Sequence, residues 1–299
     1  MNFKQWMWAS ALLASIPVAA EQASQSATTG RAESVMTMRV DGELAIDTQG
    51  QVLDYRIDTK LQPELQQLIA KAVPSWLFWP VVIDGKPVAA KTNMRITLAA
   101  RPVDTGYAIK VDNVTFRTES ASPPDPRLYK DTVSITSKSM KPPGYPKGLQ
   151  QAGAEGMVLL YLKINLDGKV DQVTAAQSSL FNIKGSAKTM ETGLALLEAS
   201  TVTAAKRWTF QVDPKGKAVT DEDLTISVPV LYLLAKKNIN AAGLWRQEVR
   251  GPMHRAPWLH QIGDIRLAQR PGVSDFDSGE MLPLTSPFKI RDGVVGKAL

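Results

Sequence analysis

Few residues of this 299-residue chain have the types that catalysis or metal binding requires. The two histidines, His254 and His260, stand six positions apart, so they do not share one face of a helix. A zinc site needs three or four convergent ligands, and the chain has no cysteine to supply one. The sequence also lacks the Gly-x-Ser-x-Gly turn that would present a serine nucleophile. We therefore predict no metal site and no catalytic centre, and hence a protein that is not an enzyme.

Acidic and glycine-rich motifs point the same way. Asp221-Glu222-Asp223 is the densest acidic run, but its place just before an apolar strand predicts a solvated turn rather than an acid–base pair. No Gly-x-Gly-x-x-Gly or Gly-Lys-Ser/Thr motif is present, so we expect no phosphate-binding loop and no cofactor. The formal net charge of +6 is dispersed along the chain, which argues against nucleic-acid binding.

The N-terminal sequence predicts export. Residues 1–20 contain one lysine, an apolar stretch and the small residues Val18-Ala19-Ala20, as a cleavable signal peptide does. The apolar stretch is shorter than the roughly 20 residues that span a bilayer. We expect a periplasmic protein that meets membranes only through its partners. An uncleaved N-terminus that anchors the chain in the inner membrane, facing the periplasm, stays open as an alternative.

Composition divides the rest of the chain into segments. Residues 21–34 are small and polar, which predicts a flexible leader, and residues 119–141 are rich in Pro, Ser and Thr, which predicts a linker. Residues 235–299 form a basic tail, rich in Pro and Gly, with no sustained period. We expect the tail to be irregular and to lie against a domain.

Between these segments lie two copies of one unit, at residues 35–118 and 142–234. Each copy has two apolar runs around a turn glycine, Gly50 or Gly168, then a helical pattern that ends on Trp-x-Phe, and then a closing strand. The aromatic pairs are expected to anchor the core where helix meets sheet. The predicted fold class is α+β. It consists of two small domains, each strand-strand-helix-strand, with an antiparallel three-stranded sheet and one packed helix.

The second copy resembles the TonB C-terminal domain family over about residues 142–234. The residues that carry this resemblance are Pro143-Gly144-Tyr145-Pro146, Gly156, Asp167-Gly168-Lys169-Val170, Leu197-Glu198, Lys206-Arg207-Trp208-Thr209-Phe210, Gly216-Lys217-Ala218-Val219 and Val228-Pro229-Val230. The first copy shares the hairpin and the Trp-x-Phe motif but lacks the Tyr-Pro segment, so it reads as a degenerate repeat. The N-terminal apolar run contains no histidine, and the long proline-rich spacer of full transducers is missing. The resemblance therefore implies a binding domain rather than an energy transducer.

Domains of this family bind a short receptor segment as an added strand along their last strand. Such binding exploits the unpaired backbone groups of an edge strand. By this resemblance, the partner-binding residues would be Tyr145, Pro146, Leu224, Ile226, Val228 and Val230. We expect a protein that binds an extended segment of a TonB-dependent outer-membrane receptor, or of another envelope protein, in support of transport across the outer membrane.

Three alternatives stay open. In one, the chain is a structural envelope scaffold whose two sheets pair with each other and whose basic tail contacts cell-wall or membrane anions. In another, an uncleaved N-terminus makes it a membrane-anchored energy transducer. A homodimer formed by strand exchange is also open, because free sheet edges favour such exchange.

Overall fold

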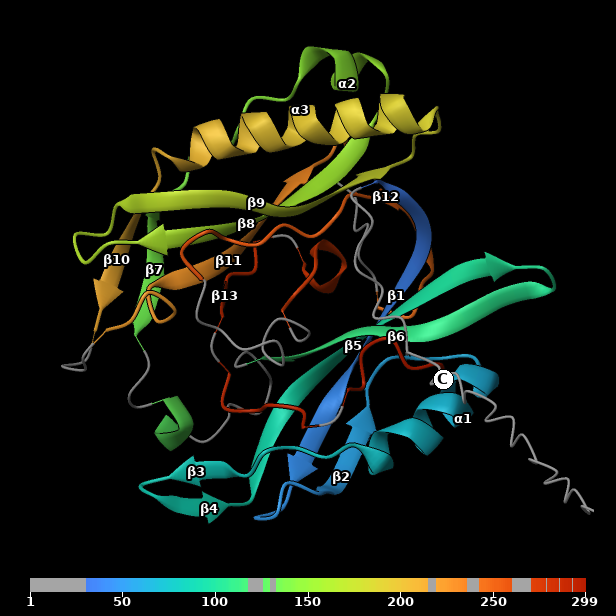
Figure 1. The fold of residues 1–299 in the computed structure, drawn as a ribbon, viewed down its shortest axis with the longest axis vertical. Coiled ribbons are helices and arrows are strands. Elements are labelled where there is room, and N and C mark those ends of the chain that lie inside the picture. The colour runs from blue at the N-terminus through green and yellow to red at the C-terminus, as the bar shows by residue number, and fades with distance from the viewer. Residues whose placement is uncertain are drawn as a thin grey trace, which may run out of the picture.

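The computed structural model describes residues 31–117, 126–129, 133–214, 219–235, 242–259, 270–277, 279–284, 286–291 and 293–299 (Figure 1). The predicted signal peptide and most of the predicted leader lie outside these residues. The described chain mixes helices and strands, is mainly strand, and places most strands in one antiparallel sheet. None of its described helices is both long enough and apolar enough to cross a membrane.

The first copy builds the unit that its sequence predicts. Its elements are β1 (Glu33–Ile46), β2 (Val52–Ile57), α1 (Pro63–Ala72), a 3₁₀ turn η1 (Val73–Ser75) and the closing strand β5 (Ala90–Val103). Strand β1 lies between β2 and β5 and pairs antiparallel with both. The structure adds two features to the predicted unit. A small hairpin of β3 (Val81–Ile83) and β4 (Lys86–Val88) lies between η1 and β5, and a strand β6 (Gly106–Arg117) follows β5 and pairs with it. Strand β1 begins two residues before the predicted domain boundary.

The second copy repeats the same order. Its elements are β8 (Glu155–Ile164), β9 (Val170–Phe181), α3 (Ala187–Ala205) and the closing strand β11 (Thr225–Tyr232), preceded by a short helix α2 (Lys147–Gln151). Strand β8 lies between β9 and β11, as β1 lies between β2 and β5. A side pair joins β10 (Thr209–Asp213) to β7 (Ser134–Ser139). Strand β7 comes from residues predicted to be linker, so that segment is not a simple connection. A short 3₁₀ turn η2 (Pro126–Tyr129) precedes it.

The two turn glycines make matching contacts. Gly50 and Gly168 have φ angles of 82° and 77°, a region that glycine adopts without a steric penalty. The carbonyl oxygen of each accepts a hydrogen bond from the phenylalanine N–H of the Trp-x-Phe motif, at 2.8 Å to Phe78 and 2.7 Å to Phe210. A Cβ atom on either glycine would stand 2.1 or 1.9 Å from the carbonyl oxygen of that phenylalanine. The hairpins of the two copies thus make the same hydrogen bond and the same close backbone contact with their Trp-x-Phe motifs.

The predicted separation into two three-stranded sheets is wrong. A tail strand, β12 (Arg246–Arg250), pairs with β9 on one side and β1 on the other. It joins the copies into a nine-stranded sheet of order β13-β11-β8-β9-β12-β1-β5-β6, with β2 paired to β1. The tail also supplies a 3₁₀ turn η3 (Val273–Asp275) and a two-residue strand β13 (Leu282–Pro283). Pairing between distant segments, which no local pattern announces, creates this continuity.

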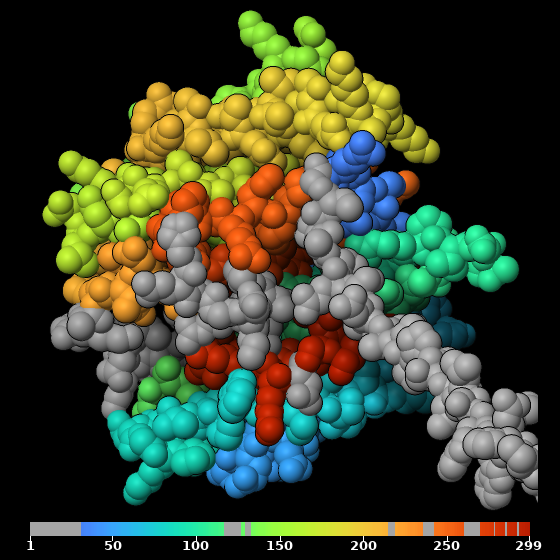
Figure 2. Space-filling view, viewed as in Figure 1, coloured from blue at the N-terminus to red at the C-terminus, as the bar shows by residue number. Residues whose placement is uncertain are grey.

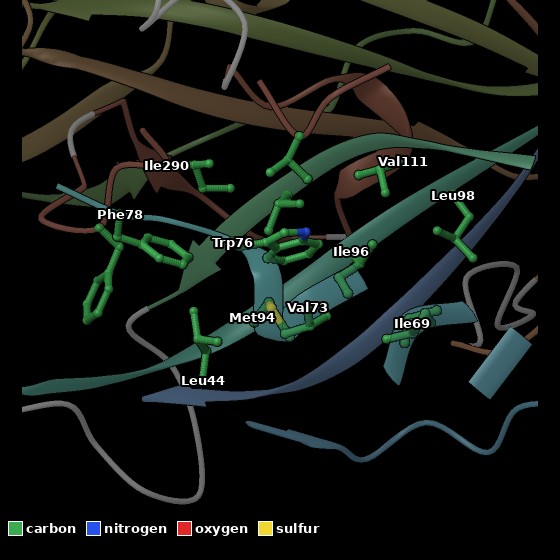
Figure 3. Packing of buried hydrophobic residues seen from close by; sticks show 14 of the residues in the cluster. Leu44, Ile69, Val73, Trp76, Phe78, Met94, Ile96, Leu98, Val111 and Ile290 are labelled. Atoms are coloured by element: carbon green, nitrogen blue, oxygen red, sulfur yellow. The ribbon is translucent and has the colours of Figure 1, made fainter. Parts of the chain in front are cut away.

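Three apolar clusters hold the elements together. In the first copy, side chains of α1, β1, β5 and β6 pack with the tail residue Ile290 around Trp76 and Phe78 (Figure 3). In the second copy, α3 covers one face of β8, β9 and β11 around Trp208 and Phe210. Both aromatic pairs are buried, as predicted. The third cluster forms where tail residues cover the opposite face of β8.

The tail lies between the two copies. Figure 2 shows the orange and red C-terminal residues between the yellow-green second copy and the blue-cyan first copy. Toward the second copy the contact is apolar, because Met157, Leu159 and Tyr161 of β8 pack against Val273 and Phe276. Toward the first copy it combines the ion pairs described below with the buried side chains of Phe288, Ile290 and Val294. The tail is therefore a middle layer of the molecule.

Candidate functional site

The closing strand β11 has a definite inner and outer edge. The Leu224 carbonyl accepts a hydrogen bond from the Ile164 N–H of β8 at 2.9 Å, and the two strands stay in register to Tyr232. Backbone groups alternate in direction along an antiparallel strand. The even-numbered residues of β11 therefore direct N–H and C=O toward β8, and Ser227, Pro229 and Leu231 direct theirs outward. Pro229 fits this parity, since a strand proline is tolerated where it faces away from the neighbouring strand.

The structure places the predicted contact residues of β11 on the side that faces β8. The side chains of Ile226 and Val228 are buried in the cluster beneath α3, and Val230 packs against it. Their backbone groups face β8, so neither part of these residues is available to an added strand. Leu224 precedes β11, and its carbonyl is occupied by Ile164. An added strand would meet the intervening odd-numbered residues instead.

The outer edge of β11 is covered over a short distance. Strand β13 pairs with it at Ile226 and Ser227 only. Among the described residues no strand continues this pairing over Val228–Tyr232. The Pro229 carbonyl and the Leu231 N–H and C=O are therefore without a strand partner among the described residues, while Pro229 is buried and Leu231 is partly buried against the third cluster. The hydroxyl of Ser227 is buried and has no hydrogen-bond partner among the described residues.

Tyr145 lies at the far end of this edge. Its ring meets the ring of Tyr232 edge-on, with centroids 5.3 Å apart, and its hydroxyl donates to the Ala154 carbonyl at 2.5 Å. The Tyr232 hydroxyl in turn lies 2.7 Å from the Thr201 hydroxyl on α3. Burial raises the pKa of both tyrosines above the ordinary value, so each ring stays a neutral phenol at neutral pH.

The Pro-Gly-Tyr-Pro segment is fixed to its own domain. The Gly144 carbonyl accepts a hydrogen bond from the Ser200 hydroxyl at 2.6 Å, and the Lys141 carbonyl accepts one from the Trp208 indole at 2.8 Å. Pro146 occupies the N-cap position of α2, where its carbonyl accepts hydrogen bonds from the N–H groups of Leu149 and Gln150. Of the two predicted residues in this segment, Tyr145 therefore lies at the site and Pro146 supports the helix beside it.

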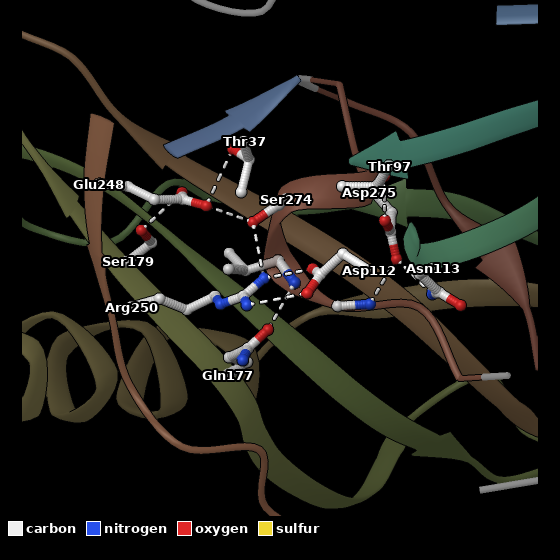
Figure 4. A network of polar contacts seen from close by, with 12 residues as sticks. Thr37, Thr97, Asp112, Asn113, Gln177, Ser179, Glu248, Arg250, Ser274 and Asp275 are labelled. Carbon is white, nitrogen blue, oxygen red and sulfur yellow. Dashed lines mark hydrogen bonds and ion pairs between the residues drawn. The ribbon is translucent and has the colours of Figure 1, made fainter. Parts of the chain in front are cut away.

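A largely buried ionic network joins the two copies at β12, which β8 and β9 separate from β11 in the sheet (Figure 4). Glu248 of β12 is paired with Arg246 at 3.1 Å and accepts hydrogen bonds from Thr37 of β1 and Ser179 of β9 at 3.1 and 2.7 Å. It also accepts one from Ser274 of η3. Burial alone would raise the pKa of Glu248, but the charges of Arg246 and Arg250, with the two serine hydroxyls, hold it below the ordinary value. Glu248 is thus an ionised carboxylate at the junction.

Arg250 extends the network to the first copy. It pairs with Asp112 of β6 at 2.5 Å and with Glu33 of β1 at 3.0 Å. Burial disfavours its charge, but the neighbouring carboxylates more than offset this effect and raise its pKa. Two of the tail arginines, Arg246 and Arg250, therefore hold the sheet together rather than facing solvent.

A second pair of arginines fixes the chain just before β13. Arg39 of β1 pairs with Asp277 at 2.6 Å and donates to the Phe276 carbonyl at 2.8 Å. Arg95 of β5 pairs with Asp41 at 2.5 Å and with Asp277 at 2.9 Å. Burial would raise the pKa of Asp277, but the two guanidinium groups lower it overall. Asp277 is thereby a charged anchor for the tail.

Sequence reasoning missed this network, although a signal was present. In β12 the charged residues Arg246, Glu248 and Arg250 recur at every second position, as one face of a strand requires. The prediction read the same segment as a solvated tail because prolines follow it.

The residues considered for metal binding do not converge. Within the described ranges no group of three His, Asp or Glu side chains is placed to hold a metal ion. His254 is exposed, and His260 lies outside the described residues. Asp221-Glu222-Asp223 forms the predicted turn before β11, where Asp221 pairs with Lys163 at 2.8 Å.

Comparisons of the chain with protein-family models, with curated proteins and with solved structures gave no significant match. The likeness to the TonB C-terminal domain therefore stays a prediction from the residues quoted above.

Proposed function

We propose that this chain is a non-enzymatic, periplasmic TonB-like protein that binds an extended segment of an envelope partner along the outer edge of β11. The expected partner is a TonB-dependent outer-membrane receptor, and the role is support of transport across the outer membrane. One observation carries the proposal. Strand β11 is paired with β8 throughout, whereas its outer edge is paired only at Ile226 and Ser227.

The open edge offers a small, directional set of backbone groups. The Leu231 N–H can donate, and the Leu231 and Pro229 carbonyls can accept. An extended peptide that satisfies these groups would contribute about 0.5–1.5 kcal/mol for each hydrogen bond. The partly buried Tyr145 ring, packed on the buried Tyr232, would supply an aromatic contact at the end of the edge. The resident strand β13 shows that this edge accepts an antiparallel strand.

The test compares two substitutions at one position. Leu231→Pro removes the outward N–H that an added strand needs, whereas Leu231→Ala removes most of the same side chain and keeps that N–H. Binding of synthetic ten-residue peptides from the N-terminal segments of TonB-dependent receptors is measured by calorimetry. We expect the alanine variant to bind within about threefold of the unmodified protein, and the proline variant to bind at least about tenfold more weakly.

Circular dichroism and thermal unfolding establish that both variants are folded. A folded proline variant that binds as tightly as the alanine variant would contradict strand addition at this edge. A failure of the unmodified protein to bind any receptor peptide would contradict the choice of partner.

A structural scaffold is the second candidate, and the position of β12 favours it. This strand joins the sheets of the two copies, as a scaffold of mutually paired sheets requires. Deleting the tail cannot separate the candidates, because the deletion removes β12 together with the basic residues. Salt dependence can separate them. Contact with cell-wall or membrane anions should weaken strongly between 50 and about 200 mM salt, while strand pairing should change little.

A further inference from the structure

We propose that the residues around β13 form a displaceable strap, residues 281–284, which occupies the first part of the docking edge and competes with the partner for Ser227. This inference rests on the proposed function, because it concerns the same edge. In this inference the strap blocks the part of the β11 edge at Ser227, and the full docking site runs from Ser227 to Leu231.

The strap and an added strand would share one ladder. In the antiparallel register Ile226 pairs with Pro283 and Ser227 with Leu282, so the ladder would run on past Val228 toward Tyr232. The chain leaves the ladder instead. Asp277 and Glu280 close a turn in which the Asp277 N–H donates to the Glu280 carboxylate at 2.7 Å, and Gly279 has a φ angle of +83°. A partner strand would therefore pair with β11 beyond Ser227, where the strap leaves the ladder.

The strap itself is held weakly. Its ladder contains two residues, and of these only Ser227 directs backbone groups toward the strap. Pro283 is exposed, while Met281 is partly buried against the cluster of the second copy, and Leu282 and Leu284 are partly buried against the cluster beneath the tail. Short pairings with few buried apolar contacts open locally at a small fraction of the global unfolding free energy.

The chain on each side of the strap is held firmly. On one side the buried side chains Arg39 and Arg95 hold Asp277. On the other side Phe288 and Ile290 are buried in the core of the first copy, and Ile290 bridges to Phe78. The strap is therefore a short span between two fixed points, and it can leave the edge without unfolding either copy.

Displacement changes what the edge offers. With the strap in place, three outward backbone groups have no strand partner among the described residues: the Pro229 carbonyl and both groups of Leu231. With the strap displaced, the N–H and C=O of Ser227 also become available. The buried Ser227 hydroxyl, which has no partner among the described residues, lies at this point of the ladder. The complete edge thus presents five backbone groups.

A disulfide that locks the strap tests the inference. The native chain has no cysteine, so Ser227→Cys with Leu282→Cys creates the only thiol pair. Directly opposed residues of a hydrogen-bonded antiparallel pair have Cα atoms about 5.5 Å apart, within the range that a disulfide spans. The same protein is then measured oxidised and reduced, with Ser227→Cys alone as the control for the substitution. The probe is the receptor-derived peptide that binds the unmodified protein most tightly.

We expect oxidation to weaken peptide binding at least about tenfold, because two outward backbone groups stay occupied, and reduction to restore it. Equal affinity in the two redox states would overturn the strap. Loss of binding in the unmodified protein and in the reduced variant would instead count against the proposed function.

Hydrogen exchange in the unmodified protein tests the strap without any peptide. Ser227 and Ile226 are adjacent, but the Ser227 N–H faces β13 and the Ile226 N–H faces β8. We expect the Ser227 amide to exchange at least about tenfold faster, through local opening of the strap. Equal exchange rates at the two amides would show that the strap does not open by itself, and would overturn the inference even if peptides bind.

Discussion

The two closing strands, β5 and β11, occupy the same place in the two copies but have different outer edges. Ile46 pairs with Ala90 in the first copy, as Ile164 pairs with Leu224 in the second, so Thr97 of β5 corresponds to Leu231 of β11. Strand β6 covers β5 from Asn93 to Val103, whereas β13 covers β11 at two residues. The difference teaches that the unit itself leaves this edge open, and that the chain which follows decides whether it is closed.

The segment that follows the closing strand differs between the two copies. After β5 the chain turns at once through Gly106, with a φ angle of +103°, and returns as β6. After β11 it leads away toward β12 instead. Where the second copy has Pro229, which lacks an outward N–H, the first copy has Arg95, whose side chain pairs with Asp277 of the tail. The first copy has thus become an anchor for the tail, and the second copy keeps an edge for docking.

The strongest way to break this comparison is to disconnect the copies at β12. Glu248→Gln leaves the buried Arg250 and the partly buried Arg246 without one compensating charge, which we expect to lower the free energy of unfolding by about 3 kcal/mol. Glu33→Gln is the matched control. Glu33 also pairs with Arg250, but it is 42% exposed, so its loss should cost no more than about 1 kcal/mol.

Chemical denaturation followed by tryptophan fluorescence measures both variants, since Trp76 and Trp208 report on one copy each. Equal effects of the two substitutions would mean that the buried carboxylate does not hold the copies together.

The next prediction sharpens the equivalence of the copies. Gly50→Ala and Gly168→Ala would each place a Cβ about 2 Å from a phenylalanine carbonyl oxygen, at positive φ. We expect each to cost about 2–3 kcal/mol of unfolding free energy and the two costs to agree within about 1 kcal/mol. Gly85→Ala is the control, because Gly85 has a φ of +77° but no atom within 4 Å of its Cβ position. That variant should show the conformational cost alone, about 1 kcal/mol. Strongly unequal costs at Gly50 and Gly168 would contradict the match between the hairpins.

The repeated unit could be predicted because its signals are local. A turn glycine, an amphipathic helix and a Trp-x-Phe motif lie within one stretch of chain, and Gly50 and Gly168 bring them to the same contacts. The parity of β11 was also accessible from sequence. Pro229 must direct its backbone away from the neighbouring strand, which places Ser227 and Leu231 on the same outer edge.

The continuous sheet could not be predicted in the same way. Strand β12 has five residues and pairs with segments about 70 and 210 positions away, as the contacts of Glu248 with Ser179 and Thr37 show. Strand β13 has two residues. The alternation of charges in β12 marks a strand but not its partners, and the positions of both short strands follow from ion pairs and hydroxyl groups contributed by distant strands. The same limit hid the strap at the docking edge.

The smallest effect that we expect concerns the pH dependence of stability, and it distinguishes two buried carboxyl groups of the tail. Asp275 of η3 is fully buried against the first copy, where it accepts hydrogen bonds from Thr97 and from Asn113, the latter at 2.6 Å. Burial raises its pKa, and the hydrogen bonds and the Gly272 N–H only partly oppose this effect. A carboxyl group with a raised folded-state pKa stabilises the fold below its unfolded pKa of about 3.9, and this contribution is lost as pH rises toward the folded value.

Asp275→Asn should remove that loss, so the advantage of the unmodified protein over the variant should shrink as pH rises from about 4. Glu248 has a lowered pKa, so it must behave oppositely: the advantage over Glu248→Gln should shrink as pH falls through the acidic range. Unfolding free energies measured from about pH 3 to 8 give both slopes in one experiment. Slopes of the same sign would show that the surroundings of Asp275 and Glu248 do not shift the pKa values of these two tail carboxyl groups in opposite directions.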